Sequence, residues 1–252
     1  MHAIETSPLT KKLAAFVALS DGDLAVLARL HKRRRSFLAG RDLVHEGQTK
    51  QSAYVLAAGW VCSYKLQPHG KRQIIDFQIP GDFLGLRSIL LRTSDHSFEP
   101  IVDIQAIEVP KGDLLDAFSE TPRLATAILW AASRDEAMVV EHLVRLGSRD
   151  ADKRLAHFLL ELFSRLTLVG MADSSGYACP LSQYHLADAL GRKHSPGAVW
   201  LLVGVIVYRV FLWTHTRTPP AFKFYQSLIL GGVAAGQMTR RSGSLRKALS
   251  MA

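Results

Sequence analysis

Three polar side chains at the start of one short segment could donate hydrogen bonds to phosphate oxygens. They are Ser182, Gln183 and His185, within CPLSQYHLADALG at 179–191. Ser182 is a good helix N-cap, because its hydroxyl can accept an amide N–H that has no partner in the first helical turn. Apolar residues then recur at helical spacing, and Gly191 can adopt the left-handed backbone that ends a helix.

This pattern is typical of the first helix and turn of a helix-turn-helix motif. In such a motif the first helix crosses the phosphate backbone of DNA, and the second helix reads the base edges. The alternative is a short capped helix of an ordinary globular domain, and the segment alone does not decide between the two. Arg192 and Lys193 follow directly and would add positive charge beside a phosphate.

The positive charge of the chain is concentrated behind this segment. The chain of 252 residues has a net charge of +9, and residues 192–252 hold nine Lys and Arg residues but no Asp or Glu. Affinity for nucleic acid is one explanation of such a segment, since Lys and Arg neutralise phosphates. A change of reading frame in the gene, or a fused foreign segment, is the other explanation.

The sequence has no recognisable catalytic or metal-binding pattern. Cys62 and Cys179 are too few for a disulfide framework or for a four-cysteine iron–sulfur or zinc site. The ten histidines form no paired-ligand spacing, and no nucleophile elbow, phosphate loop or glycine-rich nucleotide fingerprint is present. We therefore expect neither an enzyme nor a bound cofactor. Residues 1–23 lack the features of a signal peptide, so we expect a cytoplasmic protein.

Short strands separated by glycine turns are predicted between residues 36 and 110. The candidate strands are 36–38, 43–45, 52–58, 60–66, 71–78 and 101–109. This spacing favours an antiparallel sandwich or barrel, whose interior either forms a small-molecule pocket or is filled by side chains. One or two amphipathic helices are predicted before it at 9–31, and the basic run 31–35 is interpreted as a solvated junction.

Helical periodicity returns after residue 110. A short helix is predicted at 110–118 and a long one at 122–146, whose apolar stripe is interrupted by the polar residues 133–136. A helix of that length spans about 36 Å, which is more than one small domain needs. We therefore expect a partner helix in a symmetric dimer, with Val139 and Leu143 at the contact.

A second amphipathic helix is predicted at 148–166. One apolar stripe faces the core, and the pattern assigns Glu161 and Arg165 to the face that points away from it. A polar loop at 170–176 then leads to the candidate helix-turn-helix segment.

In this order the chain resembles the Crp/Fnr family of bacterial transcription regulators. The resemblance rests on residues 43–86, on RDADKRLAHFLLELFSRL at 149–166 and on 179–191, and it covers about residues 10–191. It implies a cyclic-nucleotide-binding-type β-roll, a dimerisation helix and a winged-helix DNA-binding domain. It also implies a homodimer that binds double-stranded DNA at two-fold symmetric operators and responds to a small-molecule effector. Contact with RNA polymerase is left open.

The resemblance also locates an effector cassette. The equivalent residues here are Gly81, Asp82, Phe83, Gly85, Leu86 and Arg87. Cyclic-nucleotide binders of the family carry a glutamate where Leu86 stands, and an Arg-Ser/Thr pair that is missing from DHSFEP at 95–100. A ribose hydroxyl would lack its acceptor and a cyclic phosphate its bidentate counter-charge, unless Arg87 substitutes. We do not expect cyclic AMP as the effector, and residues 81–85 are interpreted as a turn of the roll.

The resemblance stops after residue 191. The family continues with a recognition helix, whereas Pro196 and Gly197 here would break a helix within its second turn, so no base-reading residue is carried over. Residues 192–252 are interpreted as a substitute for the lost winged-helix part, as a packed C-terminal element or as a membrane-associated segment. The membrane is the least favoured partner, because the apolar run 198–213 is shorter than the roughly 20 residues that span a bilayer.

These observations predict an α+β fold with four parts. An antiparallel, jelly-roll-type β-roll sensor domain at 1–118 precedes a dimerisation helix at 119–147. The first part of a helix-turn-helix domain lies at 148–191, and an atypical basic hydrophobic tail at 192–252. The predicted function is that of a DNA-binding transcription regulator with an unidentified effector. The alternative is a ligand-sensing dimer with defective DNA reading that acts through protein partners.

Overall fold

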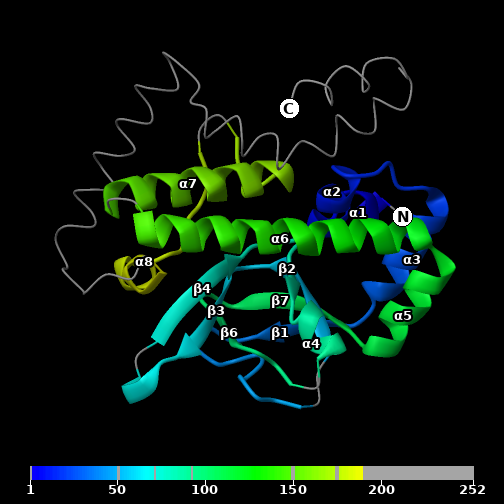
Figure 1. The fold of residues 1–252 in the computed structure, drawn as a ribbon. Helices are drawn as coiled ribbons and strands as arrows, with labels where there is room; N and C mark the ends of the chain where they lie inside the picture. Colours follow the sequence, from blue (N-terminus) through cyan, green and yellow to red (C-terminus); the bar gives the residue numbers. More distant parts are fainter. Residues whose placement is uncertain are drawn as a thin grey trace, which may run out of the picture.

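The computed structural model of the chain describes residues 2–49, 52–70, 72–91, 93–148, 151–173 and 176–189. Within these residues, two antiparallel sheets form a roll that a long helix crosses, and shorter helices lie at both ends of that helix (Figure 1). The predicted α+β class, with an antiparallel roll followed by helices, is confirmed. The boundaries of the four predicted parts stay predictions.

The roll is built from strands that pair in two sheets. One sheet has the order β1 (Arg34–Phe37), β7 (Ile104–Val109), β2 (Ala53–Ala58) and β5 (Phe83–Leu84). The other has the order β4 (Arg72–Gln78), β3 (Val61–Leu66) and β6 (Ser97–Pro100). Successive side chains of a strand point to opposite faces of its sheet. The inward-facing ones form a buried apolar cluster with Val44, which lies outside the strands; its other members are Leu56, Val61, Leu84, Phe98, Ile104 and Ala106. Side chains therefore fill this part of the interior.

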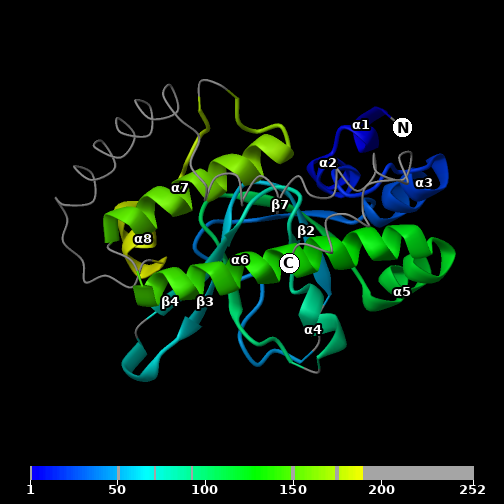
Figure 2. The same ribbon diagram turned by 45° about the horizontal axis from the view of Figure 1, so that its top comes forward.

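The N-terminal helices and the helix after the roll share a second core. They are α1 (His2–Glu5), α2 (Pro8–Ala14), α3 (Asp21–Leu30) and α5 (Lys111–Glu120). The start of α3 is fixed by a capping box, in which Ser20 and Asp23 each accept the main-chain amide of the other. Leu13, Leu27 and Leu124 are fully buried where these helices meet the long helix. Figures 1 and 2 both place α1, α2, α3 and α5 at one end of it.

The long helix α6 (Pro122–Ser148) is unbroken over 27 residues, so the prediction of a single long helix is confirmed. Its proline lies in the first turn, where a missing amide N–H does no harm. Its buried apolar residues, Leu124, Ala127, Ile128, Ala131 and Met138, follow the helical period along one side of the helix. Helix α7 (Ala151–Leu168) turns back from the end of α6, and α8 (Gln183–Ala189) lies at the end of α6 away from α1–α3 (Figure 2). Among the described helices, none is both long and apolar enough to cross a membrane.

The outer face of the second sheet forms a third core together with α7 and α8. Cys62 and Tyr64 of β3 and Ile74 and Phe77 of β4 pack there against apolar residues of both helices. The rings of Phe77 and Phe158 lie 5.4 Å apart between centroids. The roll and the C-terminal helices therefore share apolar packing.

Three strand predictions need correction. Residues 43–45 form no strand, because only Val44 pairs there, in an isolated bridge to Phe98. The strand predicted at 101–109 is interrupted: residues 101–103 bend between β6 and β7, which belong to different sheets. The strand predicted at 36–38 begins two residues earlier, since Arg34 already pairs with Ile107.

Candidate functional site

The cassette turn begins with two residues that face the N-terminal helices. Gly81 has a φ of 95° and approaches α2 so closely that a Cβ would lie 2.9 Å from the carbonyl carbon of Pro8. Asp82 is 4% exposed, and its carboxylate accepts a hydrogen bond from the Ile79 amide at 2.9 Å. Both residues are therefore part of the protein interior.

The carboxylate of Asp82 is shared by two buried cations. Lys12 Nζ lies 2.7 Å from its Oδ1, and Arg165 Nη2 lies 2.7 Å from its Oδ2. Lys12 also reaches Asp135 of α6 at 2.9 Å, so α2, the cassette turn, α6 and α7 meet at this point. Burial alone would raise the pKa of Asp82, but Lys12 and Arg165 hold it below its ordinary value. Both oxygens of this candidate effector contact are thus bound by cations of the protein.

The rest of the cassette is not a plain turn, which corrects the prediction for residues 81–85. Phe83 and Leu84 form the short strand β5, and Gly85 starts helix α4 (Leu86–Leu90). Gly85 has a φ of 69°, a left-handed conformation that favours glycine. A strand of two residues and a helix of five are too short to give a periodic pattern, so the sequence did not predict them.

Arg87, the cation among the cassette residues, faces a carboxylate of the protein. Its Nη2 lies 3.1 Å from Asp95 Oδ2, and Asp95 Oδ1 lies 2.8 Å from Nδ1 of the buried His96. An anion that approached Arg87 would therefore meet the negative charge of Asp95 as well. Leu86 offers no acceptor for a ribose hydroxyl.

The other candidate residues lie at the start of α8. The hydroxyl of Ser182 accepts the His185 amide at 3.3 Å, and the Ser182 amide donates to His185 Nδ1 at 3.1 Å, so the predicted N-cap is confirmed. Burial, assisted by the charge of Arg72, lowers the pKa of His185, which favours the neutral ring that this cap requires. Gln183 is half-buried beside them. The two basic candidates, Arg192 and Lys193, lie outside the described residues, as do Gly191 and the tail.

The C-terminal end of α8 is held by the roll and by α6. Gln73 Nε2 of β4 donates to the Asp188 carbonyl at 2.7 Å, and Arg72 Nε lies 3.9 Å from the Asp188 carboxylate. His142 Nε2 of α6 lies 3.2 Å from the Ala189 carbonyl. Carbonyls in the last turn of a helix have no partner within it, so Gln73 and His142 supply what the helix lacks. They also fix the position at which the chain leaves α8.

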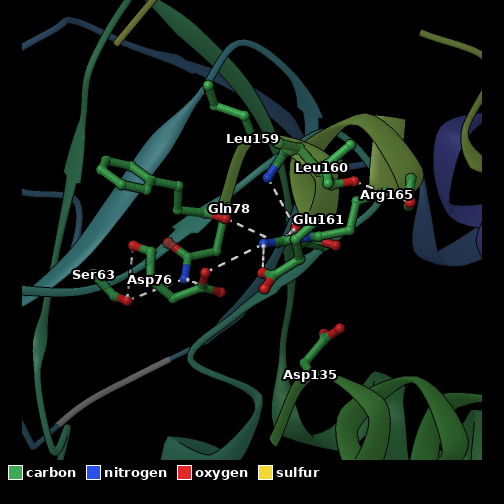
Figure 3. A network of polar contacts seen from close by, with 12 residues as sticks. Ser63, Asp76, Gln78, Asp135, Leu159, Leu160, Glu161 and Arg165 are labelled. Atoms are coloured by element: carbon green, nitrogen blue, oxygen red, sulfur yellow. Dashed lines mark hydrogen bonds and ion pairs between the residues drawn. The ribbon is translucent and has the colours of Figure 1, made fainter. Parts of the chain in front are cut away.

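Two residues that the sequence pattern assigned to the solvent side of α7 are buried, and that prediction was wrong. Arg165 is 2% exposed and donates to the Phe77 carbonyl at 2.8 Å, while its Nη1 lies 3.2 Å from Asp76 (Figure 3). Glu161, one turn earlier, lies 3.7 Å from the same guanidinium. The reason is that α7 is covered twice, by the second sheet and by α6. Phe77 of the sheet, His142 of α6 and Glu161 of α7 line one narrow cleft where the three meet. The position of both residues beside the apolar stripe was the only sign of this in the sequence.

The chain is similar to known proteins of several bacteria. A family model described as a cyclic nucleotide-binding domain matches residues 34–121, from β1 into the end of the helix after the roll. The nitrogen fixation regulation protein FixK of Bradyrhizobium diazoefficiens is 34% identical over 160 residues, which are 63% of this chain and 66% of that protein. The transcriptional activatory protein AadR of Rhodopseudomonas palustris is 30% identical over 190 residues, which are 74% of this chain and 77% of that protein. The structure of FixK2 from Bradyrhizobium japonicum matches with a TM-score of 0.58 and 26% identity, over 71% of this chain and 84% of that one.

The chain belongs to the Crp/Fnr family. Its named relatives are a regulation protein and a transcriptional activatory protein. Among the described residues of this Crp/Fnr chain, no group of three His, Cys, Asp or Glu side chains could hold a metal ion.

This Crp/Fnr chain exposes an apolar surface on the C-terminal half of α6. Leu143 is 68% exposed and Val140 is 53% exposed, three residues before it and therefore on the same side of the helix. Val139 and Val144 extend the exposed surface to the neighbouring positions. The residues named from the sequence for a helix–helix contact, Val139 and Leu143, thus lie on an exposed face.

Proposed function

We propose that this Crp/Fnr chain is a DNA-binding transcription regulator that acts as a homodimer and answers an effector other than a cyclic nucleotide. The observation that carries the proposal is the place of α8. It is a Ser182-capped helix held against the roll and the long helix, in a chain 30% identical to a transcriptional activatory protein over 77% of that protein. The Ser182 hydroxyl and the Gln183 amide are the proposed phosphate contacts, with Arg192 and Lys193 as basic neighbours.

The apolar face of α6 supports the homodimer. A Leu side chain contributes about 1.5–3 kcal/mol when it is taken out of water, so the exposed Leu143 favours a partner surface. A second copy of the same helix offers the matching face, because a two-fold axis pairs identical patches.

The charges at the cassette support an effector that carries no cyclic phosphate. Asp95 already accompanies Arg87 at 3.1 Å, and Leu86 replaces the acceptor that a ribose hydroxyl needs. We therefore expect cyclic AMP to leave DNA binding unchanged.

The test is a footprint and an electrophoretic mobility shift with the full chain and duplex DNA from the promoter region of its own gene. We expect a protected site with two-fold symmetry, and an affinity that falls steeply as salt rises, because phosphate contacts release counterions. Gln183→Ala should weaken binding to all sequences alike, since phosphate contacts do not distinguish bases. Ser119→Ala, on the exposed end of α5, is the matched control and should bind as the native chain does. The absence of any protected site at low salt, with every effector tried, would overturn the proposal.

A second candidate function is favoured by the sequence after residue 191. Pro196 and Gly197 stand where the family has its recognition helix. A chain that senses a ligand and dimerises, but acts through protein partners, fits this feature. A dimer in solution that protects no DNA sequence would support this function over the first.

A further inference from the structure

We infer that Asp82 is a positioning residue that couples the cassette turn of the roll to the C-terminal helices, by docking α7 through Arg165. One oxygen of the Asp82 carboxylate binds a cation of α2, and the other binds a cation of α7. Oδ1 lies 2.7 Å from Lys12 of α2, and Oδ2 lies 2.7 Å from Arg165 of α7. Lys12 is 1% exposed and Arg165 2%, so the bridge is closed off from water.

The turn that carries Asp82 is in close contact with α2 and with strand β2. Gly81 leaves no room for a Cβ against the backbone of Pro8, and its amide donates to the Leu56 carbonyl of β2 at 2.8 Å. Gly85, which opens α4, follows only three residues after Asp82. A displacement of this cassette therefore displaces the carboxylate to which α7 is bound.

Arg165 has the geometry that such docking requires. Its planar fork contacts the Asp82 carboxylate and the Phe77 carbonyl through Nη2, and the Asp76 carboxylate through Nη1. A guanidinium holds its N–H donors in a rigid planar fork, whereas a lysine ammonium is a compact charge on a flexible stem. The desolvation of both charges offsets much of the stability that a buried ion pair adds, so the effect expected of this one is on the arrangement of α7.

Asp82→Asn is a clean test because both cations keep another carboxylate. Lys12 retains Asp135 at 2.9 Å, and Arg165 retains Asp76 at 3.2 Å. Neither charge is left buried alone, so the fold should survive while the bridge is cut. Asp95→Asn is the matched control, because Asp95 belongs to the same part of the roll but pairs with Arg87.

Hydrogen exchange of the full chain, followed by mass spectrometry, measures the docking. In Asp82→Asn we expect amides of Ala151–Leu168 to exchange about ten- to a hundredfold faster, because a charged hydrogen bond that holds α7 is lost. Amides of the central strand Ile104–Val109 should stay as slow as in the native chain, and Asp95→Asn should leave α7 unchanged. Exchange of α7 within about twofold of native in Asp82→Asn, or equal acceleration in both variants, would overturn the inference.

Arg165→Lys keeps the test decisive if Asp82→Asn does not fold. It preserves the charge but removes the fork, so α7 should again exchange faster while the central strands stay protected. Unchanged exchange of α7 in this variant would likewise overturn the inference.

The inference rests on the proposed function only in taking α7 and α8 as parts of a DNA-binding unit. The exchange measurement needs no DNA, so the two can fail separately. Faster exchange of α7 in a chain that protects no DNA would leave the docking intact and overturn the proposed function. Specific DNA binding with unchanged exchange would do the reverse.

Discussion

The side-chain amide of Gln73 donates a hydrogen bond to the main-chain carbonyl of Asp188, with 2.7 Å between nitrogen and oxygen. A strand of the roll thereby completes the last turn of α8. In Gln73→Ala this carbonyl loses the hydrogen bond from Gln73, which should lower the free energy of unfolding by about 1 kcal/mol. It should also speed hydrogen exchange in Gln183–Ala189. Urea unfolding and exchange mass spectrometry measure the two effects.

The control for this prediction is Gln105→Ala on β7. Gln105 also bonds through its side chain, to Arg34 at 3.2 Å, but on an exposed surface. Its replacement should leave α8 unchanged, and an equal effect of both variants on α8 would contradict the role of Gln73.

Gly81→Ala should lower the free energy of unfolding by more than the backbone strain at this position alone. The positive φ itself costs about 1–2 kcal/mol for a residue with a Cβ. The new Cβ would also lie 2.9 Å from the Pro8 carbonyl, so either α2 or the turn must shift. We expect a total loss of about 2–4 kcal/mol in urea unfolding.

Gly47→Ala separates these two causes. Gly47 has a φ of 81°, but a Cβ there meets nothing within 4 Å. Only the backbone cost of about 1–2 kcal/mol should remain. Equal losses in the two variants would show that the contact with Pro8 is unimportant.

Leu143→Glu should split the proposed dimer. A carboxylate in the centre of the apolar α6 face would be buried without a partner, which strongly disfavours association. Sedimentation velocity should show a monomer, while circular dichroism stays native because Leu143 is exposed within one chain. Leu115→Glu, on the exposed face of α5, should remain dimeric. A native-like dimer of Leu143→Glu would reject this face as the contact.

Lowering the pH should reduce the free energy of unfolding, in part through protonation of His96. Burial lowers the pKa of His96 below its ordinary value of 6.5, although Asp95 opposes the shift. The unfolded chain therefore takes up a proton that the folded protein resists. The stability that the buried, neutral His96 contributes is fully present above about pH 6.5. It is lost as the pH falls, by at most about 1.4 kcal/mol per pH unit.

Urea unfolding of the native chain and of His96→Gln, at about pH 7.5 and pH 5.5, measures this loss. The variant should lose less stability on acidification. Some loss should remain, because burial also lowers the pKa of His31 and of His185. The same loss in the native chain and in His96→Gln would show that His96 does not contribute to the loss of stability in acid.

Residues with strong local preferences were predicted correctly from the sequence. The apolar positions of α6 recur with the helical period from Leu124 to Met138, and Ser182 caps α8 as its type and position suggested. Both follow from interactions within a few residues of the chain, which a sequence displays directly.

The errors concern elements that depend on distant partners. Arg165 follows an apolar stripe that reveals one buried face, whereas α7 is buried on two. Ser97–Pro100 contains a charged residue and a proline, and it becomes a strand because it pairs with β3. Asp82 was taken for an effector contact by analogy. Its two cations lie 70 and 83 residues away in the chain. No local sequence pattern predicts such contacts.

The core that the second sheet shares with α7 and α8 limits how this chain can be divided. Ile74 and Phe77 are at most 1% exposed because those helices cover them. A polypeptide shortened after α6 would expose these side chains to water as an aggregation-prone apolar patch. We expect such a truncated protein to aggregate on expression, unless these sheet residues are replaced by polar ones.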